Sequence, residues 1–419
     1  MAGTGDIDGK GWLLIAASTL GVAVCVIPVS ILSLGVFMKP LGEAFGWGRG
    51  EIAFALTILS CAMAVAMPIA GRMIDRFGVR VPLVTSLFLY GIGILCLPVL
   101  IDNFGLTALY AVALWLGVTG SASSSVAYVK ILSGWFDRSR GLALGFAMSG
   151  VALGGATAPF LAASLIEAFD WRAGFYGLAL LPLIVGIPIG LYVHEAPAAL
   201  SARQGGDLTL LPGVTATQAS RMRIFWVLLA LFLIAATAIH GIQIHLAPLL
   251  SDRGLAPDMA ALGVSFMFGI SAVVRLIAGY AFDRMFAPWI GAVCFLCACI
   301  GAALLIPATD PTIYLVAVAL LGIGAGAESD LLAILVGRYF GLRSFATIYG
   351  WLFASFMVGS ALGPFFLGVG FDTTGSYATA LAWCAGGLAL TTLMLVMLPR
   401  FPVWGARQEP AAAPAVAIA

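Results

Sequence analysis

The stretch Gly71-Arg-Met-Ile-Asp75-Arg76 decides the fold of this chain, because it returns as Gly279-Tyr-Ala-Phe-Asp283-Arg284 in the second half of the sequence. A second motif, Gly150-Val-Ala-Leu-Gly154, returns as Gly359-Ser-Ala-Leu-Gly363 at almost the same separation. One constant spacing shared by two different motifs indicates an internal duplication. We therefore predict two similar halves, each of which carries one copy of both motifs.

The composition predicts that lipid, and not water, surrounds most of the chain. Of its 419 residues, 62% are hydrophobic and 9% are charged, whereas a soluble domain carries about 25% charged residues. The net charge of +1 gives no basic field that would attract nucleic acid. These values argue against a soluble enzyme and against a nucleic-acid-binding protein, and they make the lipid bilayer an expected partner.

Long apolar runs separated by short polar breaks recur along the whole sequence, and a membrane-spanning helix needs about 20 such residues. We predict an all-α membrane protein with twelve transmembrane helices in two six-helix pseudo-symmetric bundles. The spans are expected near 11–38, 51–70, 81–101, 106–133, 141–167, 172–193, 222–249, 259–280, 288–307, 312–336, 344–371 and 376–399.

The longest hydrophilic stretch, from His194 to Arg223, contains no apolar span and divides the chain. Parallel halves of this kind place a transport site between them, near the middle of the membrane. We expect an N-terminal bundle over 1–193, a cytoplasmic linker over 194–221, a C-terminal bundle over 222–401 and a disordered cytoplasmic tail over 402–419.

The distribution of positive charge predicts the orientation in the membrane. If the N-terminus is cytoplasmic, most of the 20 Lys and Arg residues lie at the inner face, as membrane proteins prefer. Both termini are then cytoplasmic, which requires an even number of spans. The first apolar run is too long for a cleavable signal and lacks a small-residue cleavage site. We expect a multi-pass protein of the cell inner membrane, present as a monomer.

The stretch Gly71-Arg-Met-Ile-Asp75-Arg76-Phe-Gly78-Val-Arg80 resembles the loop between helices two and three of the major facilitator superfamily, both in pattern and in position. The resemblance implies the fold of that superfamily and a secondary transporter that works by alternating access, with two halves rocking about a central site. The residues expected to latch the cytoplasmic side, through charge pairs and helix-end dipoles, are Gly71, Asp75, Arg76, Asp283 and Arg284.

A narrower resemblance lies at Trp135-Phe136-Asp-Arg138-Ser-Arg140-Gly-Leu142-Ala143-Leu-Gly145. It looks like the aromatic-Phe-x-Lys-Arg-Arg-x-Leu-Ala-x-Gly element of monocarboxylate transporters, although Ser139 departs from the basic triplet. Asp8-Gly9-Lys10-Gly11-Trp12 is loosely similar to the start of the first helix in that family. The oxalate–formate antiporters share the element seen here at Trp135 to Gly145, so the resemblance implies a small organic anion as substrate.

Arg275 stands inside a predicted span, in Ser271-Ala-Val-Val-Arg275-Leu-Ile-Ala-Gly279. An arginine at the centre of a spanning helix costs about 2.5–3.5 kcal/mol on insertion scales, and its guanidinium can bind a carboxylate through two parallel hydrogen bonds. The arrangement also matches the arginine that binds the substrate carboxylate in monocarboxylate transporters, with Ser271 where that family often has Asp or Asn. The alternatives are a structural pair with an acidic neighbour and a side chain that snorkels to the inner face.

Glu328 and Asp330 are the acidic residues that we place deep in a span, in Gly326-Ala-Glu328-Ser-Asp330. They stand roughly 12–15 Å above the inner face at 1.5 Å per residue, a depth similar to that of Arg275. Since they are two residues apart, they point in different directions, and both cannot face Arg275. Either could exchange the coupled proton when it is removed from water. A purely structural ion pair is the alternative.

His240 and His245 flank Gln243 in His240-Gly-Ile-Gln243-Ile-His245-Leu-Ala-Pro. Histidine titrates near neutral pH and can donate to a carboxylate. The two rings point in different directions, so at most one is expected in the site. Depth favours His240, whereas the similarity of the run after His245 to bacterial relatives favours His245. A packed histidine is the alternative for each.

The predicted spans hold few other cations. Oxalate–formate antiporters carry a lysine on helix eleven, where we align Phe356, and mammalian relatives use a lysine in helix one, which has no counterpart between Lys10 and Lys39. One fixed positive charge favours a monoanion, because a second buried carboxylate would lack a partner. Lys130 lies close to the inner face, where we expect it to snorkel; a contact on the exit path of the anion is the alternative.

Two other patterns have simpler explanations. Gly322, Gly324 and Gly326 lie within a predicted helix and do not follow a strand, so we interpret them as close helix packing and not as a nucleotide loop. The serines of 121–125 form a small polar patch that could line the cavity. We find no metal-ligand spacing and no acyl-transfer triad, and we expect no cofactor.

These features together predict a secondary transporter of a small organic monocarboxylate, coupled to a proton, and not an enzyme. The alternatives are an organic anion exchanger, similar to the oxalate–formate antiporters, and a carrier of another small solute. The expected substrate contacts are Arg275, His240, His245, Ser271 and Gln243, and the expected proton-coupling residues are Glu328 and Asp330.

Overall fold

The computed structural model describes residues 9–204, 211–255, 257–307 and 310–402. Within this part of the chain, 12 helical segments are long and apolar enough to cross a membrane. The prediction of an all-α protein with twelve spans is therefore confirmed. Residues 403–419 of the tail expected over 402–419, and Asp8 of the first-helix motif, lie outside the described residues.

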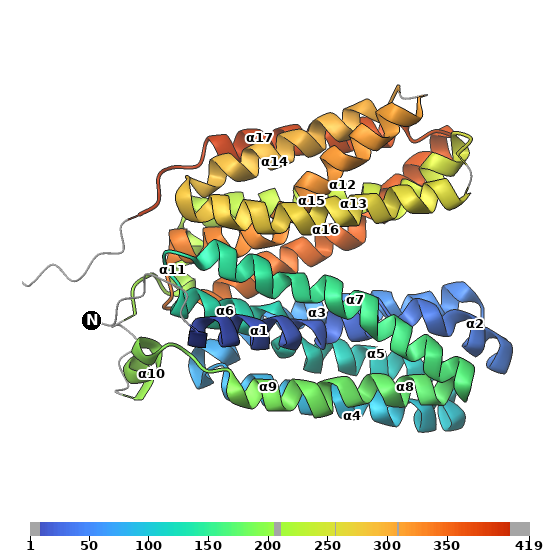
Figure 1. The fold of residues 1–419 in the computed structure, drawn as a ribbon, viewed down its shortest axis with the longest axis horizontal. Coiled ribbons are helices and arrows are strands. Elements are labelled where there is room, and N and C mark those ends of the chain that lie inside the picture. Colours follow the sequence, from blue (N-terminus) through green and yellow to red (C-terminus); the bar gives the residue numbers. More distant parts are fainter. Residues whose placement is uncertain (1–8, 205–210, 256, 308–309, 403–419) are drawn as a thin grey trace, which may run out of the picture.

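The helices form two groups that lie side by side with their long axes roughly parallel (Figure 1). The N-terminal group contains α1 (Gly9–Ala23), η1 (Ile27–Ile31), α2 (Leu34–Phe45), α3 (Arg49–Phe77), α4 (Arg80–Phe104), α5 (Leu106–Gly120), η2 (Ser121–Ser123), α6 (Ser125–Trp135), α7 (Arg140–Ala168), α8 (Trp171–Leu180), η3 (Leu181–Gly186) and α9 (Ile187–Tyr192). The C-terminal group contains α12 (Arg223–Asp252), α13 (Pro257–Arg284), α14 (Ala287–Leu304), α15 (Pro311–Phe340), α16 (Phe345–Thr374) and α17 (Ala378–Val396).

Two short helices, α10 (Pro197–Gln204) and α11 (Ala216–Arg221), lie between the groups in the sequence. Both are found at one end of the molecule, at the left of Figure 1, which we name the linker end. We name the opposite end, where α2 lies, the far end. The two groups meet where α3 packs along α16 and where α7 packs along α13.

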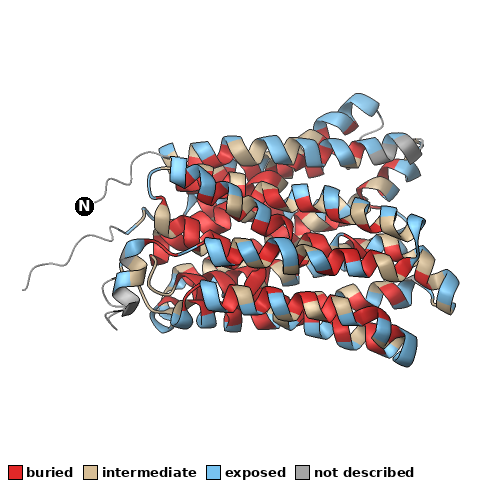
Figure 2. Ribbon diagram, turned by 60° about the horizontal axis from the view of Figure 1, so that its bottom comes forward, coloured by how far each residue is buried: buried red, intermediate tan, exposed pale blue. Residues whose placement is uncertain are grey.

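The outer surface of both groups is apolar, as a lipid environment requires. Trp383, Phe160 and Val65 each expose more than 70% of their area. The helix faces that point toward neighbouring helices are mostly buried (Figure 2). Exposed aromatic and aliphatic side chains on this scale would be unfavourable in water. The surface therefore fits a protein whose helices contact hydrocarbon along most of their length.

One expectation about the repeated motif is wrong: Asp75, Arg76, Asp283 and Arg284 do not lie in loops. Helix α3 continues to Phe77, and α13 continues to Arg284, so these residues occupy the last turns of two helices. Gly78 ends α3 with a φ of 88°, and its N–H donates to the carbonyl of Ile74. The charged residues ended the apolar pattern, but the helix persists because this turn packs against α16.

The last part of the connection between the groups is fastened to the C-terminal group. Gly213 forms an antiparallel bridge with Gly341, the residue that follows α15. Val214 donates to the carbonyl of Phe340 at 2.9 Å, and Leu342 donates to that of Pro212 at 2.8 Å. Gly213 and Gly341 have φ angles of 126° and 76°, and a Cβ on either would overlap the backbone of the other segment. Only glycine fits both positions.

Candidate functional site

Helix α15 approaches α13 closely because its glycines remove side chains from the contact. A Cβ on Gly326 would overlap the backbone of Ser271, and one on Gly322 would lie against the carbonyl of Met267. Such small residues let membrane helices approach each other closely. The contact sets Arg275, one turn after Ser271, beside Asp330, which follows Gly326 by one turn on α15.

Arg275 and Asp330 form a loose buried pair. Arg275 Nη1 lies 3.5 Å from Asp330 Oδ1, and the two side chains are 16% and 0% exposed. A charge-assisted hydrogen bond of this type is usually about 2.7–2.9 Å long. The other carboxylate oxygen, Asp330 Oδ2, is buried and has no hydrogen-bond partner among the described residues. The guanidinium of Arg275 thus keeps N–H groups that could donate hydrogen bonds to another carboxylate.

Arg275 lies where the two groups of helices meet. Gly145 of α7 faces the backbone carbonyl of Arg275, so close that a Cβ would lie 3.0 Å from it. The Tyr349 hydroxyl of α16 forms a hydrogen bond of 3.2 Å with Ser125 at the start of α6, which joins the two groups of helices. Ser125 belongs to the polar patch predicted from the sequence, whereas nothing in the sequence pattern distinguishes Tyr349.

Glu328 faces a different helix and forms a second pair with His240 of α12. Glu328 Oε2 lies 3.8 Å from His240 Nδ1, and the side chains are 2% and 27% exposed. The same nitrogen lies 3.2 Å from the carbonyl of Ala236, which a neutral ring can reach as a donor. Glu328 Oε1 is buried without a hydrogen-bond partner among the described residues. The rings of Phe356 and His240 lie nearly perpendicular to each other, with their centroids 5.2 Å apart.

His245 lies apart from these acids and connects three helices of the C-terminal group. Its Nε2 lies 2.9 Å from the carbonyl of Pro364 in α16, and its Nδ1 lies 3.2 Å from the hydroxyl of Tyr377. Both ring nitrogens are therefore occupied by partners within that group. Gln243, two residues earlier, is partly buried on the same helix. The structure groups His240, and not His245, with the buried acids.

The repeated aspartates hold the two groups together at the linker end. Asp75 of α3 accepts hydrogen bonds from the backbone N–H groups of Ala346 and Thr347, at 3.2 and 2.7 Å, and from the Thr347 hydroxyl at 2.6 Å. Asp283 of α13 accepts from Gly141 and Leu142 at 2.6 and 3.0 Å. Each carboxylate thus meets the first turn of a helix of the other group, where the helix dipole favours negative charge.

The glycines of the motif permit this approach, whereas its arginines take no part in it. A Cβ on Gly71 would overlap the carbonyl of Ala346, and one on Gly279 would overlap Gly141. Arg76 and Arg284 are exposed and lie over the rings of Phe77 and Tyr280. The expectation that these two arginines close the latch is therefore not supported by their contacts.

Lys130 does not snorkel to the surface, as was expected from its position. Its side chain is 10% exposed, and its Nζ lies 2.8 Å from Asp75 Oδ1 and 3.5 Å from Glu195 Oε1. It also donates to the carbonyl of Ile74 at 3.2 Å. The lysine therefore neutralises the aspartate of the latch and ties it to the first residues after α9.

A further set of latch residues was missed by the sequence analysis. Arg338 of α15 lies 3.4 Å from a carboxylate oxygen of Asp137 and donates to its carbonyl at 3.2 Å. The buried guanidinium of Arg140 lies 3.3 Å from the same carboxylate. The sequence shows only that these charges lie near one membrane face, because Arg338 and Asp137 belong to opposite halves of the chain.

The described residues contain no group of three or more His, Cys, Asp or Glu side chains that could hold a metal ion. The charged and titratable groups of the candidate site are one guanidinium, two carboxyl groups and one imidazole. Such a set can exchange hydrogen bonds and protons with a small ionic ligand.

Comparison with known proteins gives both a family and a set of relatives. A family model described as the Major Facilitator Superfamily matches residues 13–364. The chain is 25% identical to the uncharacterized MFS-type transporter YhjX of Escherichia coli over 79% of this chain and 82% of that protein. It is 26% identical to monocarboxylate transporter 11 of Mus musculus over 94% of this chain and 88% of that protein.

Solved structures support the fold. The E. coli fucose:proton symporter FucP matches with a TM-score of 0.69 and 14% identity, over 93% of this chain and 98% of that chain. The proton:xylose symporter XylE matches with a TM-score of 0.69 and 15% identity, over 93% and 96%. At this level of identity the likeness concerns the arrangement of helices alone.

Proposed function

Since this chain belongs to the major facilitator superfamily, we propose that it carries a small organic monocarboxylate across the membrane together with a proton. The resemblance to that superfamily and to its monocarboxylate transporters is confirmed, and the chain is a multi-pass membrane transporter and not an enzyme. The observation that carries the proposal is the loose contact between Arg275 and Asp330, where the two groups of helices meet.

A carboxylate suits Arg275 better than a neutral solute does. A guanidinium within a membrane needs an anion, and a planar carboxylate can accept two parallel hydrogen bonds from it. The contact with Asp330, at 3.5 Å, leaves donors for this purpose. Similarity to proteins named as monocarboxylate transporters supports the same class of substrate.

The charge of the site supports the proposal that a proton is transported together with the anion. When a substrate carboxylate occupies Arg275, Asp330 loses its cation, and a lone buried carboxylate is strongly unfavourable. Uptake of a proton by Asp330 removes that charge, so one proton accompanies one monoanion. Glu328 with His240 is a second pair that can hold a proton, and it remains the other candidate for coupling. His240 and Ser271, which border the two pairs, are proposed to contact the substrate.

The latch supports a mechanism of alternating access. We propose that the linker end is cytoplasmic, that both termini lie there, and that the protein is a monomer of the cell inner membrane. Asp75 and Asp283 then seal the cytoplasmic side, and the site is reached from outside. When the latch parts, the two bundles, joined by the linker of 194–221, rock and expose Arg275 to the cytoplasm.

The test is uptake of radiolabelled formate, acetate, lactate and benzoate into proteoliposomes at acidic and alkaline external pH. We expect one of these monoanions to accumulate faster from the acidic side. Arg275→Gln should abolish this uptake, whereas Arg72→Gln, which changes an exposed arginine of the same group of helices as Asp75, should leave it intact. Normal uptake by Arg275→Gln would remove the proposed site. Exchange of two anions without pH dependence would favour the organic anion exchanger.

A further inference from the structure

A groove opens at the linker end of the C-terminal group, away from the candidate site. It has a volume of about 320 Å³ and lies between the start of α12 and the ends of α15 and α17. Two arginines, Arg223 and Arg400, line it together with Tyr339 and with methionine, isoleucine and proline side chains. The groove therefore joins positive charge to apolar surface.

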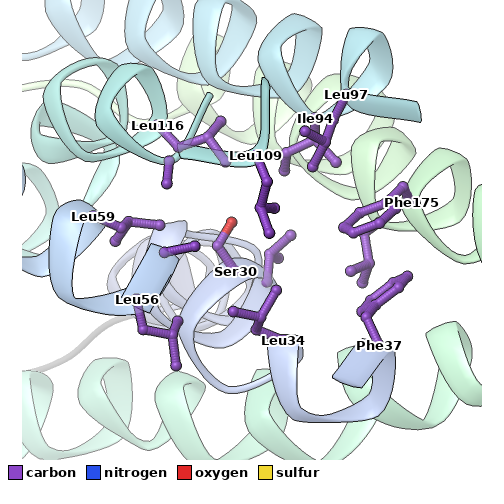
Figure 3. A pocket seen from close by; sticks show the side chains of 14 residues that line it. Ser30, Leu34, Phe37, Leu56, Leu59, Ile94, Leu97, Leu109, Leu116 and Phe175 are labelled. Atoms are coloured by element: carbon purple, nitrogen blue, oxygen red, sulfur yellow. The ribbon is translucent and has the colours of Figure 1, made fainter. Parts of the chain in front are cut away.

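The hollow inside the N-terminal group has a different character. It lies around Ser30, in the wide turn η1 that interrupts the first span, and leucine, isoleucine and phenylalanine side chains surround it (Figure 3). Its volume is about 40 Å³, which leaves room for about three water molecules at most. The Ser30 hydroxyl already shares a hydrogen bond of 2.7 Å with that of Tyr90. This hollow offers neither a charged contact nor space for a solute, whereas the groove offers both.

The two arginines of the groove have no anionic partner within the described part of the chain. The side chains of Arg223 and Arg400 are exposed, and neither forms an ion pair with a described Asp or Glu. The first turn of α12 adds its free N–H groups, since no side chain caps that helix at Met222. Two guanidinium groups and the positive end of a helix dipole repel one another unless an anion lies among them.

The segment that carries Arg400 is fixed in place. The ring of Phe401 packs against both Phe286 and Tyr339, with ring centroids 4.8 Å apart in each pair. The Tyr339 hydroxyl also donates to the carbonyl of Pro399. The general preference for positive charge at the inner face requires only that arginines lie outside the hydrocarbon. It does not require a backbone that holds one arginine beside another, so this arrangement fits a ligand that carries negative charge.

Apolar side chains continue from the groove toward the hydrocarbon. Trp226, three residues beyond Arg223 in α12, exposes 59% of its area, and Met397, three residues before Arg400, exposes 74%. In both segments the arginine lies nearer the linker end, and the exposed apolar residue lies deeper in the membrane. A phospholipid has the same order, with its phosphate at the surface and its acyl chains below. A soluble anion would contact the arginines alone.

We propose that this groove binds an anionic phospholipid. Arg223 and Arg400 hold its phosphate, the first turn of α12 donates to the same group, and the acyl chains lie along Trp226 and Met397. Basic pockets at the ends of membrane helices suit lipid headgroups of this kind. The bound lipid joins α12 to the segment after α17, and it thereby stabilises the C-terminal group. The inference does not depend on which solute the protein carries.

The test measures lipid binding to the full chain in dodecyl maltoside by native mass spectrometry. The probes are palmitoyl-oleoyl phosphatidylglycerol, which is anionic, and the phosphatidylcholine with the same acyl chains, which has no net charge. We expect the first phosphatidylglycerol to bind roughly 10- to 30-fold more tightly than phosphatidylcholine, because two basic residues contribute to the difference. Arg223→Gln with Arg400→Gln should abolish this preference. Arg72→Gln with Arg80→Gln, which removes two exposed arginines from the N-terminal group at the same end, should preserve it.

A competitor separates a lipid from a soluble anion. Excess glycerol 3-phosphate, added as its ammonium salt, should not displace phosphatidylglycerol, because it cannot reach the apolar side chains. Displacement would assign the groove to a soluble anion and overturn the proposal. An unchanged preference in the variant that lacks both Arg223 and Arg400 would also overturn it. If that variant does not fold, Arg400→Gln alone, which changes an exposed side chain after the last helix, should reduce the preference by roughly 3- to 5-fold.

Discussion

At the scale of single residues, the sequence predicted how deep the charged residues lie in the membrane, but it did not predict their ion-pair partners. The sequence placed Arg275, Glu328 and Asp330 at similar depth, and the spacing of two residues showed that the acids point apart. It could not show that Asp330 meets α13 while Glu328 meets α12, because that depends on which helices are neighbours.

The two acids are expected to differ in transport. Asp330→Asn removes the partner that Arg275 has in the empty site, so substrate binding should no longer require a proton, and uptake should lose its dependence on pH. Glu328→Gln leaves the pair with Arg275 intact, so uptake should still rise as external pH falls. The measurement is initial uptake by both variants across a pH series. The reverse result would assign proton coupling to Glu328.

His245 is expected to stabilise the fold without contacting the substrate. His245→Ala leaves the Pro364 carbonyl and the Tyr377 hydroxyl without their partner, which should lower the free energy of unfolding by about 1–2 kcal/mol. The substrate concentration at half-maximal uptake should not change. His240→Ala serves as the matched variant, since it should alter uptake more than stability. Thermal unfolding and uptake are measured on both variants. If the substrate concentration at half-maximal uptake rises for His245→Ala alone, this assignment is contradicted.

At the scale of elements, the apolar pattern located every span but not every end or break. Helix α3 carries Asp75 and Arg76 beyond its apolar part, because one face of its last turns packs against α16, a helix far away in the sequence. The break at η1 could not be predicted from the apolar pattern either. Val24 to Ile31 is an apolar run apart from Ser30, and a hydropathy pattern does not distinguish a wide turn from a regular one.

The two aspartates of the latch, Asp75 and Asp283, are expected to stabilise the N-termini of two different helices. Asp75→Asn removes a charge from the first turn of α16, and Asp283→Asn removes one from the first turn of α7. Each change should weaken its own contact by about 0.5–2 kcal/mol, or roughly 2- to 30-fold in local opening. Hydrogen exchange should accelerate at Ala346 and Thr347 in the first variant only, and at Gly141 and Leu142 in the second only. Equal acceleration at both helix ends would show that the latch opens as one unit.

At the scale of the whole molecule, the side-chain bonds between the two groups gather at one end. Among the described residues, those that involve Asp75, Asp283 and Arg338 lie at the linker end, and the bond between Ser125 and Tyr349 lies deeper. The side chains at the far end bond within their own group, as Arg172 does with Asp102. The repeat predicted two halves, but which end is closed depends on contacts between them that no single half reveals.

This arrangement predicts one-sided access to the site. Ser271→Cys, placed one turn before Arg275, should react with a membrane-impermeant thiol reagent added outside intact cells. It should react slowly in inverted vesicles, where the linker end faces the reagent. Asp75→Asn in the same background should increase the reaction in inverted vesicles, because it weakens the seal. Faster labelling in inverted vesicles without that second change would mean that the linker end is not sealed.

The Gly213–Gly341 bridge has a consequence for how variant libraries of this protein are interpreted. Each position rejects any side chain because the opposite backbone occupies the space, so no compensating change at the partner can rescue a first substitution. Both positions will therefore score as intolerant in a growth selection, although neither approaches Arg275. A ranking of residues by mutational sensitivity alone would count them among the substrate contacts, and only expression level measured beside growth would separate chain assembly from transport.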